Sequence, residues 1–104
     1  MKILAIETEI QNTGSEAFEP YLKSEAARVW DLVQAEFIRE VYFRQDRSDA
    51  VLVLECENIT TAREILKSLP LVRVGLIEFD LIPLRPYPGF SRLFESESEH
   101  VLPE

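Results

Sequence analysis

The chain has 104 residues, of which 46% are hydrophobic and 29% are charged, a composition typical of one globular domain rather than a disordered chain. Its net charge of −8, with no basic stripe, argues against nucleic acid and against an anionic membrane as partners. A lone cysteine, Cys56, excludes an internal disulfide, and no apolar run is long enough to span a membrane. We therefore expect a cytoplasmic protein.

In chain order, the first half predicts one strand, one helix and a hairpin. The strand is expected at residues 2–8, in the apolar segment MKILAIETE. The helix is expected at about 16–35, where apolar residues recur at helical spacing and Glu25 belongs to the solvated side. The segments FIREVYFR (37–44) and DAVLVLECE (49–57) favour strands, and the polar residues QDRSD between the two apolar runs predict a hairpin turn.

The second half predicts one more helix, one more strand and an arm. Asn58 can cap a helix that Pro70 ends, and a last strand is expected at about 76–83. The order β-α-β-β-α-β is the ferredoxin-like pattern, an α+β fold with a four-stranded antiparallel sheet. We expect a single domain over residues 1–94, in which 85–94 form a C-terminal arm, and an acidic, frayed tail over 95–104.

The charged residues of the strands predict a polar face. Side chains alternate along a strand, and two helices can cover only one face of the sheet. In the second strand we expect Phe37, Val41 and Phe43 under the helices, with Arg39 among them. The other face then gathers polar residues beside Ile38, Val51 and Val53, namely Glu7, Glu40, Tyr42, Arg44, Glu55, Glu78 and Asp80. Such a mixed face suits burial against a second copy, which predicts a homodimer, or a higher oligomer, around a partly polar cavity.

Several of these segments resemble the muconolactone isomerase-like family of the dimeric α+β barrel superfamily. The resemblance is strongest over EILKSLPLVRVGLIEFDLIPLRPYPG, where Leu-Pro-Leu (69–71) follows the helix and a strand bearing Glu78 ends in Pro-Leu (83–84) before a proline-bearing arm. FIRE, with Arg39 after an apolar residue, is similar to the family's second strand. The resemblance implies ferredoxin-like subunits paired sheet to sheet, and an activity that moves a proton on a small lactone acid without a cofactor.

The candidate chemistry depends on carboxylates. The one histidine, His100, lies in the tail, the glycines form no phosphate loop, and we expect neither a metal nor a cofactor. Carboxylates crowded in a poorly solvated cavity have raised pKa values and can move a proton. The predicted catalytic residues are Glu55, Tyr42 as a hydrogen-bond donor and Arg44 as the group that holds an anionic substrate. The predicted substrate-binding residues are Glu7, Glu40, Glu78 and Trp30.

Two interpretations of these residues stay open at this point. In the first, the protein is a cofactor-independent, isomerase-like enzyme or a binding protein for a small organic acid or lactone. In the second, it is a structural or regulatory homo-oligomer, and Arg44 merely pairs with Glu55 or Glu40 across the hairpin. Two roles also stay open for Trp30, which either packs on the sheet or binds a ligand.

Overall fold

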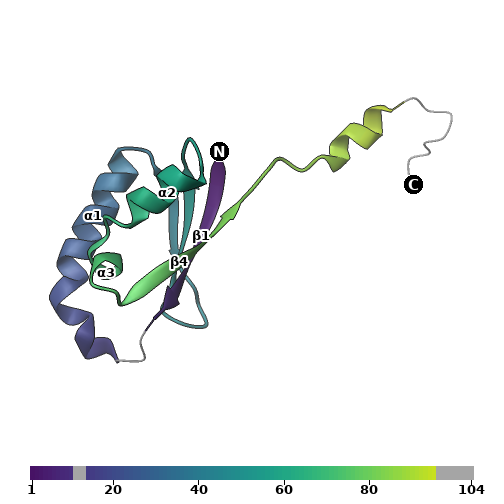
Figure 1. The fold of residues 1–104 in the computed structure, drawn as a ribbon. Helices are drawn as coiled ribbons and strands as arrows, with labels where there is room; N and C mark the ends of the chain where they lie inside the picture. The colour runs from purple at the N-terminus through teal and green to yellow at the C-terminus, as the bar shows by residue number, and fades with distance from the viewer. Residues whose placement is uncertain (11–13, 96–104) are drawn as a thin grey trace.

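The fold is a single four-stranded sheet with helices on one face, as the computed structural model of the chain shows for residues 1–10 and 14–95 (Figure 1). The strands are β1 (Lys2–Glu9), β2 (Ile38–Phe43), β3 (Ala50–Glu55) and β4 (Ile77–Pro83). Their order in the sheet is β2-β3-β1-β4, and each neighbouring pair is antiparallel. This arrangement confirms the predicted α+β, ferredoxin-like fold.

Three helices cover the sheet: α1 (Leu22–Gln34), α2 (Ile59–Leu66) and the short α3 (Pro70–Arg73). Two single 3₁₀ turns (15–17 and 19–21) precede α1, so the helix begins later than expected. Asn58 caps α2 as predicted, because its Oδ1 accepts a hydrogen bond from the backbone N–H of Thr61 at 2.8 Å. Pro70 begins α3 rather than ending α2, since the φ angle of proline suits the first position of a helix. No helix in the described part of the chain has the length and apolarity to cross a membrane.

The core lies between these helices and the face of the sheet that they cover. Alternate residues of β1 and β3 point into it, and helix residues close it from the other side. The largest fully buried side chains are Ile3, Ile38, Leu52, Leu54, Leu69 and Ile77. We call this side of the sheet the helix-covered face and the other side the open face.

A bulge in β2 changes the predicted face of Ile38. Ile38 pairs with Leu54 of β3, but the next paired residues are Glu40 and Val53, so Arg39 is an extra residue that breaks the alternation. Ile38 is therefore buried in the core, and its predicted place on the open face is wrong. Arg39 is exposed in the bulge instead of lying under the helices, and its Nε donates a hydrogen bond to the carbonyl oxygen of Glu36 at 2.8 Å.

Glu7 also lies on the face opposite to the predicted one. It continues the alternation of Ile3 and Ala5, which are both completely buried in the core. Its side chain is thus on the helix-covered face, where strict alternation along β1 places it. On β2 the side chains of Val41 and Phe43 share this face, as predicted, because they pair with residues of β3 that also lie under the helices.

After β4 the chain leaves the body as an arm. Among the described residues, the last backbone hydrogen bond to the sheet joins the N–H of Leu84 to the carbonyl oxygen of Lys2 at 2.9 Å. The chain then runs outward to a 3₁₀ segment, Gly89–Phe94, which Figure 1 shows well away from the sheet. The apolar side chains of this arm join neither core cluster. The predicted acidic tail lies outside the described residues, apart from Glu95.

Candidate functional site

A cavity of about 520 Å³ lies between α1 and the helix-covered face of the sheet. Its wall is mostly apolar, with side chains from α1, β2, β3 and the connection to α3. Glu7 from β1 and Glu25 from α1 are the ionisable groups of this wall. A second hollow of about 370 Å³ adjoins it, and the two share Glu7, Leu22, Phe43 and Leu71. The first hollow, called here the helix–sheet cavity, has a volume typical of small-molecule sites, about 300–1,000 Å³.

Glu7 is held in this cavity through one carboxylate oxygen. Its Oε1 accepts a hydrogen bond from the backbone N–H of Ala50 at 2.8 Å, which ties the side chain to the start of β3. Burial raises the pKa of Glu7, the bond from Ala50 opposes this shift, and the nearby charges of Asp49 and Glu25 add to it. Because the bond to Ala50 occupies one oxygen, the second oxygen can meet a molecule in the cavity. Glu7 therefore has the anchoring and the pKa shift expected of a residue that transfers protons.

Glu25 lines the cavity and also bonds the backbone of α3. Its Oε1 accepts a hydrogen bond from the backbone N–H of Leu71 at 2.9 Å, in the first turn of α3. This bond satisfies one of the N–H groups that a helix start leaves without a partner. Burial raises the pKa of Glu25, and the bond from Leu71 acts in the opposite direction. Glu25 thus contributes negative charge to the cavity while its carboxylate stabilises the helix.

Asp49 is a buried acid beside the adjoining hollow. Its Oδ2 lies 2.6 Å from Nε of Arg47, so the two side chains form an ion pair within the hairpin turn. The turn between β2 and β3 thereby brings a paired carboxylate close to Glu7, where its charge favours the protonated form of Glu7.

Two aromatic side chains mark the opening of the helix–sheet cavity. Trp30 of α1 and Phe43 of β2 line the cavity, yet they are 62% and 69% exposed. Residues that line a cavity and also meet solvent lie at its mouth, which therefore opens between α1 and the edge strand β2. From this position Trp30 can contact a molecule that enters the cavity. Its predicted role in substrate binding stays a prediction.

Three of the predicted site residues lie on the open face and have local partners. The hydroxyl of Tyr42 donates a hydrogen bond to Oε1 of Glu40 at 2.9 Å, and this bond raises the pKa of Tyr42. Oε2 of Glu55 accepts a hydrogen bond from the amino group of Met1 at 2.8 Å, which lowers the pKa of Glu55. These side chains are on the opposite side of the sheet from Glu7, so one copy of the chain does not unite them in one site.

Arg44 and Glu78 are separated from these residues as well. The guanidinium of Arg44 binds Asp46 through two hydrogen bonds of 2.9 and 2.6 Å, so it forms neither of the pairs with Glu55 or Glu40 that were expected. Glu78 is on β4, at the edge of the sheet opposite β2, roughly 14 Å away at the usual strand spacing. The roles predicted for the residues of the open face stay predictions, since they would need a second copy to complete a site.

Sequence reasoning missed Glu25 and Asp49 as members of the site. Glu25 was assigned to the solvated side of its helix, but it is three residues after Leu22 and four before Val29, within the apolar stripe. An acid inside such a stripe is a usable signal for a polar group facing the sheet. For Asp49 the hairpin turn gave no comparable signal, because polar residues are normal in turns.

The fold is similar to that of a solved structure. The 5-chloro-2-hydroxyhydroquinone dehydrochlorinase TftG from Burkholderia phenoliruptrix AC1100, in complex with 2,5-dihydroxybenzoquinone, matches with a TM-score of 0.67 and 14% sequence identity, over 82% of this chain and 94% of that chain. This likeness supports the α+β, ferredoxin-like fold. No protein-family model and no curated protein match the chain.

Proposed function

We propose that the helix–sheet cavity binds a small, uncharged organic ring compound and that Glu7 moves a proton on it without a cofactor. The observation that carries this proposal is the carboxylate of Glu7, which is half-buried, held by the N–H of Ala50 and raised in pKa by burial inside an apolar cavity. A raised pKa brings the carboxyl group nearer to the pH at which it can both accept and return a proton. The likeness to TftG, whose complex holds an oxygenated ring, agrees with a ligand of this class.

The charge of the cavity favours a neutral ligand over an organic acid. Its described lining has two acids, Glu7 and Glu25, and no Lys, Arg or His. A second carboxylate brought next to these groups would be repelled and would have no cation to offset its desolvation. Arg44, the expected anchor for an anion, is bound to Asp46 outside this lining. A lactone or a hydroxylated aromatic ring meets these conditions better than an acid does.

The proposed reaction is an isomerisation. Glu7 takes a proton from a carbon next to a carbonyl group of the ring, and the electron pair of the broken C–H bond moves toward the carbonyl oxygen. Glu7 then gives the same proton to another atom of the molecule, so no atom or electron is gained or lost. The aromatic side chains of Trp30 and Phe43 lie at the cavity mouth, where they can contact a flat ligand.

The first test is ligand screening by thermal shift, followed by kinetics on the compounds that bind. Neutral lactones, hydroxylated aromatics and quinones are expected to raise the melting temperature, and carboxylate analogues of the same rings are not. Glu7→Gln should retain binding and lose turnover by roughly 10²- to 10⁴-fold, the usual contribution of a general base. Glu40→Gln on the open face is the matched control, because it removes an acid outside the cavity. If Glu40→Gln abolishes turnover and Glu7→Gln does not, the proposed site is wrong.

The open face favours a second proposal, that two copies associate sheet to sheet. No helix within residues 1–10 and 14–95 covers this face, although Leu4, Ile6, Val51, Val53 and Ile82 give it an apolar surface. Apolar patches of this kind on a small protein mark association surfaces. A purely structural or regulatory homo-oligomer would need only this face. Light scattering on the wild type and on Val53→Lys tests it: we expect a dimer that the charge dissociates, and a wild-type monomer would refute it.

A further inference from the structure

The C-terminal arm has a defined local structure although it contacts no core cluster. Tyr87 and Phe90 pack edge to face, with ring centroids 4.9 Å apart. The ring of Tyr87 lies over Gly89 and leaves no room for a Cβ there. Pro86 and Pro88 restrict the chain before the 3₁₀ segment. The arm therefore presents a preformed aromatic surface, and Phe94, at 85% exposed, extends it.

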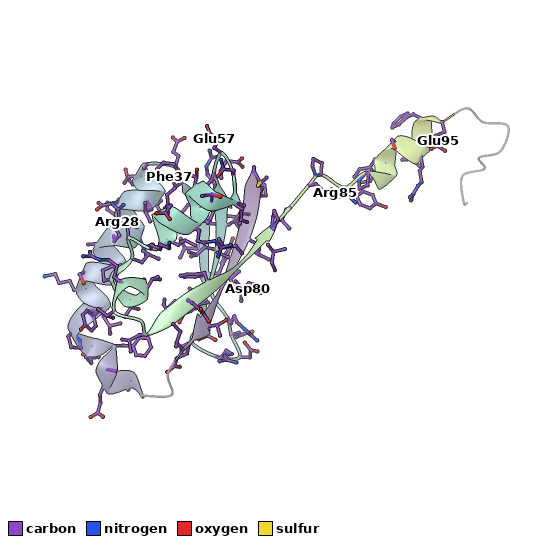
Figure 2. The ribbon with its side chains drawn as sticks, viewed as in Figure 1. Arg28, Phe37, Glu57, Asp80, Arg85 and Glu95 are labelled. Carbon is purple, nitrogen blue, oxygen red and sulfur yellow. The ribbon has the colours of Figure 1, made fainter. Side chains whose placement is uncertain are left out.

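The arm points away from the cavity of its own chain. β4 is antiparallel to β1, and its last residue, Pro83, pairs with Ile3, whereas Glu7 pairs with Phe79. The chain thus leaves the sheet about 13 Å from the level of Glu7 and continues in the opposite direction. Figure 2 shows Arg85 and Glu95 progressively farther from the body along this path. To cover its own cavity mouth, the arm would have to reverse direction within its proline-rich part.

The arm matches the mouth of the cavity in both polarity and charge. The mouth exposes Trp30 and Phe43, which leave apolar surface in contact with solvent. The two hollows behind it carry carboxylates and no basic side chain among their described lining. The arm brings aromatic rings together with two cations, Arg85 and Arg92. Its residues 84–94 span about 25–30 Å, which exceeds the roughly 15–20 Å width of a four-stranded sheet, so it can cross a neighbouring copy.

We propose that the arm of one copy closes the mouth of the helix–sheet cavity of a second copy. The aromatic side chains of the arm lie against Trp30 and Phe43, and an arginine of the arm faces the carboxylates behind them. Each cavity is then complete only in the assembly, because its outer wall comes from the other chain. This proposal concerns what covers the cavity and does not depend on the reaction within it.

Trp30 provides a direct test, because it is the only tryptophan of the chain. The acceptor is the full chain with Phe90→Ala and Phe94→Ala, which retains Trp30 and lacks the aromatic surface of the arm. The donor is the full chain with Trp30→Phe and an intact arm. When donor is added, the Trp30 emission of the acceptor should shift to shorter wavelength and become less quenchable by acrylamide. The wild-type protein should lose this protection on dilution, since the cover comes from another molecule.

The control is a donor with Trp30→Phe and Val74→Ala, which removes an exposed apolar group outside the arm and both hollows. It should protect Trp30 as well as the first donor does. A donor that also carries Phe90→Ala and Phe94→Ala should give no protection. The proposal is overturned if the intact arm leaves Trp30 as quenchable as before, or if the arm substitutions dissociate the assembly without changing Trp30, because the arm then covers another surface.

Discussion

Both faces of the sheet carry acids, but the surroundings of these acids differ. On the open face, Glu40 receives a hydrogen bond from Tyr42, and Glu55 receives one from the amino group of Met1. On the helix-covered face, Glu7 accepts one backbone hydrogen bond and is held in an apolar cavity where burial raises its pKa. Under the proposed function the reactive group is Glu7, which does not lie where the charged residues of the strands are concentrated. Desolvation of one carboxylate is the better indicator.

The largest expected difference between the faces is in packing. Leu54→Ala removes a completely buried side chain from the helix-covered face and should lower the free energy of unfolding by about 2–5 kcal/mol. Its neighbour Val53 is on the open face and only half-buried, so Val53→Ala should cost less than about 1.5 kcal/mol. Urea unfolding measures both. Equal losses for the two variants would mean that the open face is as well packed as the core.

A smaller effect should distinguish the carboxylates by their response to pH. Folding raises the pKa of Glu7, so its protonated form is favoured, and this contribution is present at acid pH and lost as the pH rises through the folded pKa. Glu7→Gln cannot ionise, and at pH 7 it should be more stable than the wild type, by at most about 1 kcal/mol for a half-exposed group. The difference should vanish below the ordinary glutamate pKa of about 4.3. A difference that grows as the pH falls would contradict the assignment.

The smallest effect is expected at Arg44. Its ion pair with Asp46 is local to the hairpin turn, and solvent screens both groups. Arg44→Ala should therefore leave the melting temperature and any turnover unchanged, with Asp46→Ala as the reciprocal control. Calorimetry measures the melting temperatures of the two variants, kinetics measures turnover, and light scattering measures their oligomeric state. If Arg44→Ala dissociated a dimer and Asp46→Ala did not, Arg44 would belong to the open-face site that the sequence predicts.

The elements of the fold could be predicted because each has a local cause. Apolar periodicity gave the main helices, β-branched runs gave the strands, and the cap at Asn58 is a short-range hydrogen bond. The face on which each strand residue lies was harder to predict. One extra residue in a strand moves all side chains on one side of it to the opposite face from the predicted one. The bulge at Arg39 reversed the predicted face of Ile38. Ile38 pairs with Leu54, and alternation along the sequence does not predict this pairing.

The candidate site was the least predictable part for a related reason. A cavity is a gap between elements that are distant in the sequence, here α1 and the sheet. Local sequence patterns predict single elements and not the space between them. The predicted set did contain Glu7 and Trp30, which both line the helix–sheet cavity. It missed Glu25, whose half-buried carboxylate depends on the position of Leu71 in α3. Only the folded chain brings Glu25 and Leu71 together.

The bulge at Arg39 has a consequence for how the edge of the sheet meets other molecules. β2 is an edge strand, and an edge offers its unpaired N–H and C=O groups to any strand from another molecule. The extra residue interrupts this row and places an exposed cation there, so a foreign strand cannot extend past it. Deleting Arg39 would leave Ile38 and Val41 on their present face while making the edge regular. Such a variant should fold normally and then aggregate through strand addition as its concentration rises, which light scattering would record.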